Sequence, residues 1–201
     1  MKILVASSNP GKVREYEALA AAFGAAGRIE LALLPGLSSL AAYPEDASTF
    51  AENAAGKALH YSRFAEDAVI ADDSGLCVDA LGGAPGVQSA RYAGADAGDR
   101  ARVEKLLCEL SSHGANRNEQ RGAHFVCVLA LAQKGRAQAV VSARADGQIL
   151  TEPRGTGGFG YDPVFFYPPL GKTFAELTRE EKNQHSHRGK AFRRVLEILE
   201  A

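Results

Sequence analysis

Short polar residues and a lysine follow the first apolar run of the chain. The run Ile3–Ala6 leads into Ser7-Ser8-Asn9-Pro10-Gly11-Lys12, and apolar residues at helical spacing continue to about Ala22. The turn is therefore expected at a helix N-terminus, where backbone N–H groups and the helix dipole attract anions. A lysine in that first turn opposes the dipole unless an anion lies nearby, so the turn is a candidate phosphate loop. Its spacing differs from Gly-x-x-x-x-Gly-Lys-[Ser/Thr], and a plain turn with a solvated lysine is the alternative.

A pair of carboxylates is the second candidate. The residues Ala68–Ala71 predict a short strand that ends at Asp72 and Asp73. Adjacent carboxylates at a strand end, facing a cleft, suit Mg²⁺, which takes oxygen ligands and keeps several waters. A turn with capping aspartates is the alternative. Three acidic residues near the start of a predicted helix could supply a further ligand: Glu45, Asp46 and Glu52.

Glycines precede an aromatic pair near residue 160. Four of the six residues from 155 to 160 are glycines, namely Gly155, Gly157, Gly158 and Gly160. They lead into the stretch Phe159-Gly160-Tyr161-Asp162. Such a run is costly unless the backbone must approach something closely. An aromatic face there could stack on a nucleotide base, and Asp162 could accept from ring N–H groups. An aromatic residue that fills the core is the alternative.

A charged run precedes the last helix. It contains Lys182, His185, His187, Arg188 and Lys190. The histidines have no third soft ligand at suitable spacing, which weakens a metal-site interpretation. A solvated charged face is the usual meaning of such a run, but donors at a helix start also suit an anion or a carbonyl-rich ring edge.

Strand and helix patterns are mixed along the chain. Thr49–Glu52 reads as a capping box ahead of a helix that reaches Phe64, and Ser111–Arg121 reads as a surface loop. The mixture predicts an α/β protein with mixed α+β character, one domain over residues 1–201 with two lobes. The other expected elements are strands at Lys2–Ala6, Arg28–Leu34, His124–Gln133 and Ala137–Asp146, helices at Arg100–Leu110 and from about Arg188, and a loop over Gly82–Gly98.

Composition excludes several classes of protein. The chain of 201 residues has a net charge of −1, so no global basic field favours nucleic acid or an anionic membrane surface. No apolar stretch reaches the length of a membrane span. Its three cysteines form no C-x-x-C pair, and we expect buried free thiols in a reducing compartment, hence a cytoplasmic protein.

Five stretches together resemble the inosine/xanthosine triphosphate pyrophosphatase family. In chain order they are SSNPGKVREYE, TFAENAAGKA, ADDSGLCVDALGGAPGVQSARYAG, GTGGFGYDPVFF and GKTFAELTREEKNQHSHRGKA, spread over residues 7 to 191. The resemblance implies Mg²⁺-dependent hydrolysis of ITP, dITP or XTP between the α and β phosphates, which yields the monophosphate and pyrophosphate. It also implies an elongated mixed central sheet with flanking helices, two lobes around a deep substrate cleft, and a homodimer.

The resemblance also assigns roles to residues of this chain. Glu45 and Asp73 would hold the metal, and Asp73 would act as the base. The positions implied for substrate binding are Ser7, Ser8, Asn9, Pro10, Gly11, Lys12, Lys57, Ser74, Phe159, Gly160, Tyr161, Asp162, Lys182, His187 and Arg188. Two positions depart from the family pattern, because Ser7 replaces a threonine and His185 replaces an aliphatic residue.

Hydrogen-bond sense favours an oxo-purine base. Arg188 and nearby N–H groups can donate to a 6-carbonyl, whereas adenine would leave those donors unpaired and be rejected by ~10⁴ or more. A Maf-like pyrophosphatase acting on pyrimidine or modified-base nucleotides is the nearest rival enzyme, and the FGYD and SHR stretches favour the purine reading. A non-catalytic nucleotide sensor is the rival from another class.

Overall fold

The computed structural model describes residues 1–7, 10–25 and 27–200, with only the backbone at residues 10, 11, 13 and 118. The chain divides into two compact units. Unit 1 comprises Met1–Asp73, Cys127–Ala143 and His187–Ala201, and unit 2 comprises Ser74–Val126 and Arg144–Ser186. The division falls inside the three long strands β3 (Ala68–Val78), β4 (Gly122–Gln133) and β5 (Arg136–Ile149).

In the described residues, seven strands form one sheet in the order β2-β1-β3-β4-β5-β6-β7. The short strand β1 (Lys2–Val5) pairs in parallel with both β2 (Glu30–Leu33) and β3. A turn at Lys134-Gly135 joins β4 and β5 in a hairpin. At the other edge, β6 (Phe165–Tyr167) pairs antiparallel with β5 and with β7 (Lys172–Thr173). The expected mixed sheet with flanking helices is confirmed.

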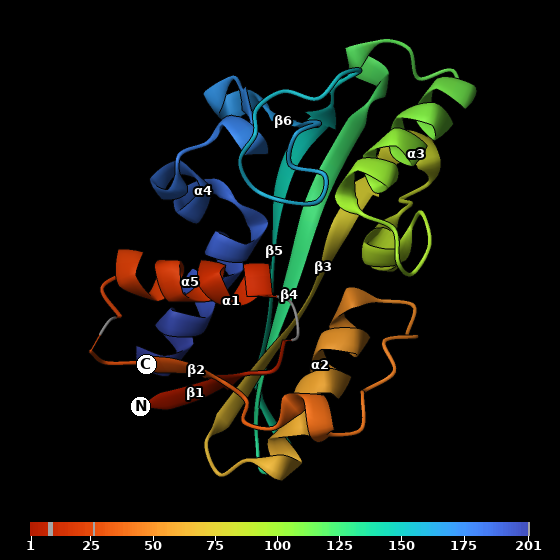
Figure 1. Ribbon diagram of the computed structural model, residues 1–201. Helices are drawn as coiled ribbons and strands as arrows, with labels where there is room; N and C mark the ends of the chain where they lie inside the picture. The colour runs from red at the N-terminus through yellow and green to blue at the C-terminus, as the bar shows by residue number, and fades with distance from the viewer. Residues whose placement is uncertain (8–9, 26, 201) are drawn as a thin grey trace. The chain divides into compact units, whose positions relative to one another are not determined.

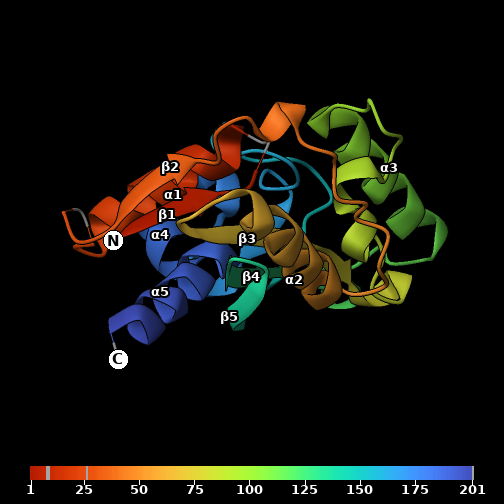
Figure 2. The ribbon, with the colours of Figure 1, turned by 90° about the horizontal axis from the view of Figure 1, so that it is seen from below.

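Helices cover both faces of the unit 1 strands. Figures 1 and 2 place α1 (Pro10–Ala22) and α2 (Phe50–Tyr61) on opposite sides of β3, and α5 (His187–Glu200) lies on the side of α1. Because side chains alternate across a strand, Ile3 and Val5 pack in the cluster of α1 and α5, whereas Leu4 between them is buried on the other face. Neighbouring residues of a unit 1 strand therefore meet different helices.

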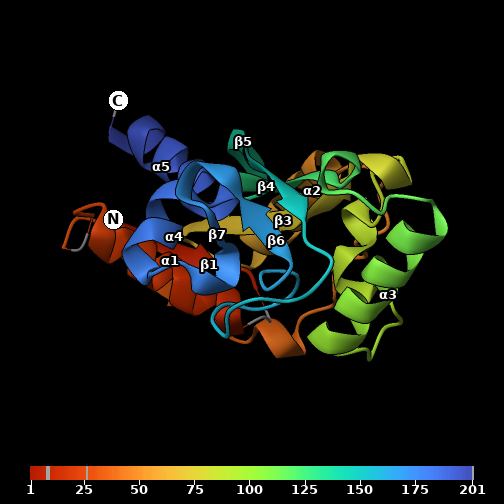
Figure 3. The same ribbon diagram turned by 90° about the horizontal axis from the view of Figure 1, so that it is seen from above.

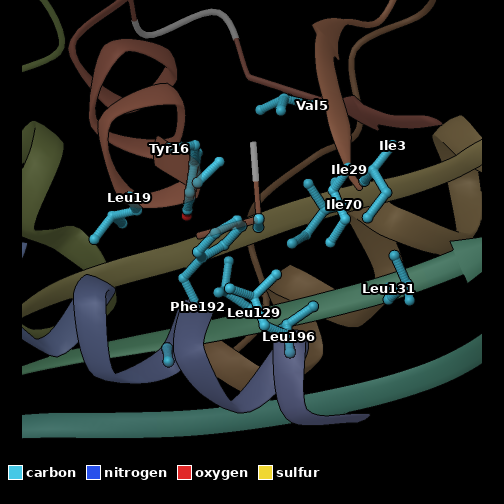
Figure 4. Packing of buried hydrophobic residues seen from close by; sticks show 14 of the residues in the cluster. Ile3, Val5, Tyr16, Leu19, Ile29, Ile70, Leu129, Leu131, Phe192 and Leu196 are labelled. Atoms are coloured by element: carbon cyan, nitrogen blue, oxygen red, sulfur yellow. The ribbon is translucent and has the colours of Figure 1, made fainter. Parts of the chain in front are cut away.

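The core between α1, α5 and the strands is closely packed. Figure 4 shows Tyr16 and Leu19 of α1 facing Phe192 of α5, with Ile3, Ile29 and Ile70 grouped beside them. The rings of Tyr16 and Phe192 lie 5.6 Å apart between centroids, within the range of favourable aromatic pairs. The helical spacing of α5 predicted this buried face, and the expected C-terminal helix is confirmed.

Unit 2 has its own core. It contains α3 (Asp99–Ser112) and α4 (Arg179–His185), which lie on opposite sides of β6 (Figures 1 and 3). The buried residues Leu106 and Leu110 of α3 pack in one cluster with Phe165 of β6 and Phe174. Short 3-10 helices complete the chain: Leu37–Ser39, Ser62–Phe64, Asp79–Leu81, Gly86–Arg91, Asn118–Gln120, Pro168–Leu170 and Phe174–Glu176.

The sequence placed most elements correctly, but it did not predict α4 or the 3-10 helix Gly86–Arg91 inside the expected loop over Gly82–Gly98. Two other predicted elements have the wrong bounds. The strand predicted over Ala68–Ala71 is too short, since β3 continues to Val78 through both aspartates. The loop predicted over Ser111–Arg121 is also partly wrong, because α3 reaches Ser112 and residues 118–120 form a 3-10 helix. In both places buried leucines continue the element: Leu76 in β3 and Leu110 in α3 are fully buried.

The helix over residues 50–61 begins as its sequence predicted. The Thr49 side chain accepts a hydrogen bond from the Glu52 backbone N–H at 3.2 Å. Helix α4 begins with a complete capping box, in which Thr178 and Glu181 bind each other's backbone N–H groups. Throughout the described ranges, each helix is too short or too polar to cross a membrane.

The free cysteines differ in burial, which predicts an order of thiol reactivity. Cys108 is exposed and Cys77 is half-buried, so the expectation of buried thiols is correct for Cys127 but wrong for the exposed Cys108. Burial raises the pKa of the Cys127 thiol to about 12. We expect Cys108 to react first with a disulfide reagent at pH 8 and Cys127 to react only on unfolding. The rates of thiol reaction in the wild type and in Cys108→Ser measure this order. If the variant lacked a slow phase of the reaction instead of the fast phase, the predicted order would be wrong.

Candidate active site

Strand β3 carries two adjacent carboxylates through the interior of the sheet. Asp72 and Asp73 are only 2% and 7% exposed, and they lie in the middle of the strand rather than at its end. Neighbouring side chains on a strand point to opposite faces, so the two carboxylates meet different partners. The expectation of a carboxylate pair at a strand end is therefore wrong, and each aspartate has its own surroundings.

Asp72 binds two cations from α1 and α5. The Nζ atom of Lys12 lies 2.9 Å from Asp72 Oδ2, and an Nη atom of Arg188 lies 3.6 Å from the same oxygen. Burial raises the pKa of Asp72, but the charges of Lys12, Arg188 and Lys57 outweigh it and hold the pKa well below its usual range. Lys12 lies in the first turn of α1, and Asp72 is the nearby anion that offsets its unfavourable position.

Arg188 joins the first helix to the last. It is 3% exposed and pairs with Glu15 of α1 as well as with Asp72. Burial lowers the pKa of Arg188, but Glu15 and then Tyr16 and Asp72 raise it well above its usual value. The sequence assigned Arg188 to the nucleotide base, and the contacts described for it lie within unit 1.

Asp73 meets a different partner, the buried amide of Asn53 on α2. Asn53 Nδ2 donates to Asp73 Oδ2 at 2.9 Å. Burial raises the pKa of Asp73 above its usual value, against the Asn53 hydrogen bond and the lysines, while Glu45 raises it further. Asp73 is thus within electrostatic reach of Glu45 and of both Lys12 and Lys57.

Glu45 and Lys57 form an ion pair beside this carboxylate. Glu45 Oε1 lies 2.8 Å from Nζ of Lys57, whose side chain is 9% exposed. Lys57 lies one helical turn after Asn53 on the buried side of α2, because residues four apart share a helix face. The helix therefore presents an amide to Asp73 and a cation to Glu45 from the same face.

The donors fit a magnesium ion held by two carboxylates. Among the described residues no group of three or more histidine, cysteine, aspartate or glutamate side chains could hold a metal. Mg²⁺ is commonly bound by one or two carboxylates, with waters and substrate phosphates completing its ligands. Glu45 and Asp73 are two such hard oxygen donors, and the negative charge of Glu45 contributes to raising the pKa of Asp73. A divalent cation removes that repulsion.

A second group of predicted residues lies in unit 2. Asp162 Oδ2 accepts from the Phe159 backbone N–H at 2.9 Å and pairs with Lys182 Nζ at 2.7 Å. The same Nζ lies 5.1 Å from the centroid of the half-buried Phe159 ring. Phe159, Asp162 and Lys182 are thus one connected group, and the Gly160 backbone N–H beside them donates to Asp99 at 2.6 Å.

Tyr161 has a structural place in unit 2. Its ring is 4% exposed within the hydrophobic cluster, and its hydroxyl donates to the Ser89 carbonyl at 2.9 Å. Burial raises its pKa. This matches the alternative in which an aromatic residue of the stretch fills the core, so Phe159 is the ring of this pair that is not fully buried.

The other predicted positions are dispersed. Ser7 follows β1 and is half-buried, Ser74 is half-buried in β3, and His187 begins α5 and is 6% exposed. Ser8 and Asn9 lie outside the described residues, and Pro10 and Gly11 are described only as the first backbone positions of α1.

Three residues of these networks had no assigned role from the sequence. Glu15 and Asn53 lie inside the stretches that carry the family resemblance, whereas Asp72 is considered with Asp73 as a pair of Mg²⁺ ligands but receives no role among the residues assigned from that resemblance. Glu15 stands three residues after Lys12, so both lie on one face of α1, which is the signal that could have indicated a joint role. His185, the unusual residue of its stretch, packs against Tyr167 with 5.7 Å between ring centroids.

Comparison with known proteins gives a consistent result. Residues 3–198 match a family model described as the Ham1 family. The chain is 53% identical over 199 residues to the dITP/XTP pyrophosphatase of Geobacillus kaustophilus, covering 99% of this chain and 94% of that protein. It is 48% identical over 202 residues to the dITP/XTP pyrophosphatase of Pectobacterium atrosepticum, covering 98% of each.

Solved structures agree with these relatives. The Ham1 protein of Staphylococcus aureus is 38% identical with a TM-score of 0.84, covering 100% of this chain and 98% of that one. A HAM1 protein from Coxiella burnetii is also 38% identical, with a TM-score of 0.86 and full coverage of both chains. The resemblance inferred from the five sequence stretches is confirmed.

The Asp72 network predicts a large stability cost when its anion is removed. We expect Asp72→Asn to lower the free energy of unfolding by about 3–5 kcal/mol, because Lys12 and Arg188 then lose a buried counter-charge. Urea denaturation at pH 7 measures the change. Asp96→Asn, at an exposed loop position, is the matched control and should change stability by less than about 0.5 kcal/mol. Equal effects of the two substitutions would contradict the proposed charge balance.

Proposed function

The chain belongs to the Ham1 family, and from this premise we propose that it hydrolyses the non-standard purine nucleoside triphosphates ITP, dITP and XTP to the monophosphate and pyrophosphate. Relatives that match nearly the whole chain are named dITP/XTP pyrophosphatases. The structural observation that carries the proposal is the group in unit 1, where Asp73 lies within electrostatic reach of Lys12, Lys57 and Glu45. Two cations and two carboxylates are the side chains that a polyphosphate and its metal need.

The phosphates are the part of the substrate that unit 1 suits. Lys12 and Lys57 supply positive charge, and the first turn of α1 supplies backbone N–H groups toward an anion. Phosphoanhydride cleavage depends on charge neutralisation and on placing a water in line, which leaves the protein little covalent chemistry. We propose Ser7 through Lys12 as the triphosphate loop.

Glu45 and Asp73 would hold Mg²⁺, which when bound neutralises charge on the phosphates. Asp73 is proposed as the base that accepts a proton from the attacking water. Asn53 donates to one oxygen of Asp73 and holds that carboxylate in one orientation. The attack then breaks the bond between the α and β phosphates, and pyrophosphate leaves.

The base is assigned to the group in unit 2. Phe159 offers a half-buried ring for stacking, and Asp162 and Lys182 hold each other beside it. Donors in this assignment suit the 6-carbonyl shared by hypoxanthine and xanthine. Adenine carries an amino group at that position, and a site built to hydrogen-bond one group rejects the other strongly. His187 and Arg188 lie in unit 1, and their part in substrate binding stays a separate prediction. We propose a homodimer as the working form.

The first prediction concerns Asp73. We expect wild-type protein with Mg²⁺ to release pyrophosphate from ITP, dITP and XTP in preference to ATP and pyrimidine triphosphates. Asp73→Asn should lower kcat by about 10²–10⁴ because the general base is lost. The melting temperature should not fall, since burial already disfavours the ionised carboxylate.

A pyrophosphate-release assay over a panel of triphosphates, with and without Mg²⁺, checks this, with Asp96→Asn as the control for the substitution itself. Binding of ITP by the wild type without pyrophosphate release would indicate a sensor. Preference for a pyrimidine substrate would indicate a Maf-like enzyme instead.

The second prediction separates phosphate binding from base selection. Lys12→Ala should raise the KM for ITP about tenfold or more, because a charge-assisted phosphate contact is removed, while the ratio of ITP to ATP turnover stays unchanged. Lys2→Ala, which removes a surface lysine paired with Glu30 on β2, is the control. An unchanged KM with a lost preference for ITP would refute the role given to Lys12.

A further inference from the structure

Asn53 binds one carboxylate of the candidate metal site and the backbone of the segment that carries the other. Its side chain is 1% exposed on the buried face of α2. The oxygen Oδ1 accepts a hydrogen bond from the Ala47 backbone N–H at 3.0 Å, and Ala47 lies two residues after Glu45. The nitrogen Nδ2 donates to Asp73 Oδ2 at 2.9 Å. One buried amide therefore connects the segment that carries Glu45 to the strand that carries Asp73.

The partners fix which way this amide faces. A backbone N–H can only donate, so the atom facing Ala47 must be the oxygen. The nitrogen then faces the acceptor-only carboxylate of Asp73, and a hydrogen bond to an ionised acceptor is stronger than a neutral one. No other rotation of the amide satisfies both partners.

The residues 41–47, here called the 41–47 segment, lie in extended form along α2. The Ala41 carbonyl is bound by His60 at 2.9 Å, and the Tyr43 backbone N–H by the Tyr61 hydroxyl at 3.2 Å. Further along the segment, Glu45 pairs with Lys57, and the Ala47 backbone N–H donates to Asn53 Oδ1. Residues 43, 45 and 47 are half-buried, whereas residues 42, 44 and 46 are exposed, which is the alternation of an extended chain.

The contact of Asn53 with Ala47 is the last of these contacts along the 41–47 segment. The same Asn53 side chain also binds Asp73 on β3. The preceding contacts hold the 41–47 segment on α2 alone. Gly56 allows the segment to come close, because a Cβ there would fall on the Tyr43 hydroxyl. Asn53→Ala would therefore remove a hydrogen-bonded connection between the segment and Asp73, while the contacts of the segment with α2 through His60, Tyr61 and Lys57 remain.

We propose that Asn53 is a positioning residue that sets the separation of Glu45 and Asp73 by binding the 41–47 segment and the Asp73 carboxylate with one amide. The inference rests on the proposed function, in which these two carboxylates hold Mg²⁺. That ion demands near-ideal octahedral geometry, so the placement of its two protein ligands matters. Residues that orient metal ligands typically change metal affinity or activity by about 10- to 100-fold when replaced.

The test compares Asn53→Ala with Ser62→Ala. Ser62 is also fully buried, follows α2 and makes two hydrogen bonds, to the Leu59 carbonyl and from the Gly135 backbone N–H. It contacts neither Glu45 nor Asp73 in the described structure, so it reproduces the loss of a buried polar group without the link. Unfolding by urea establishes how closely the two variants match in stability.

Two readouts do not require turnover. Hydrogen exchange of the Ala47 amide, followed by NMR, should become at least about tenfold faster in Asn53→Ala and stay unchanged in Ser62→Ala. Binding of Mn²⁺ as the probe ion, measured by electron paramagnetic resonance, should weaken about 10- to 100-fold in Asn53→Ala only.

Turnover supplies the third readout. Asn53→Ala should need a higher Mg²⁺ concentration for half-maximal pyrophosphate release from ITP, and saturating Mg²⁺ should restore part of the rate. Wild-type Ala47 exchange and wild-type Mn²⁺ affinity in Asn53→Ala would overturn the inference, even if the wild-type enzyme hydrolyses ITP. A wild type that releases no pyrophosphate would overturn the proposed function and leave the exchange and Mn²⁺ results to judge Asn53.

Discussion

The charged groups of unit 1 depend on one constraint, the alternation of side chains along β3. Two carboxylates at consecutive positions in the interior of a strand must face opposite sides of the sheet. Each then needs its own compensation, since an isolated buried charge is costly. Asp72 receives Lys12 and Arg188 on the side of α1 and α5, and Asp73 receives the Asn53 amide on the side of α2.

The two compensations differ in kind, and the difference separates their roles. Asp72 is held ionised by full positive charges, so it acts as a fixed anion that keeps Lys12 and Arg188 in place. Burial raises the pKa of Asp73, and Glu45 raises it further, although the Asn53 hydrogen bond and the charges of Lys57 and Lys12 oppose this shift. The first arrangement ties the first turn of α1 to β3 and α5, and the second is consistent with the proposed role of Asp73 as a metal ligand and base.

The helices contribute by bringing distant parts of the chain to β3. Glu15 and Arg188 pair although they are far apart in sequence, which ties the first helix to the last. Helix α2 presents Asn53 and Lys57 from one face, and the 41–47 segment lies along it with Glu45 directed to Lys57. In unit 2 the Phe159, Asp162 and Lys182 group is likewise built from two separate stretches, a glycine-rich loop and α4.

The sequence by itself determined the helices with strong apolar periodicity, the cap at Thr49, the mixed sheet and the family. These follow from local patterns and from motifs read in order, which do not require knowledge of long-range contacts. Tertiary structure alone decided that β3 continues through Asp72 and Asp73. Locally, Asp-Asp-Ser-Gly reads as a turn because uncompensated carboxylates need water, and the compensation comes from Lys12, Asn53 and Arg188, which are remote in sequence.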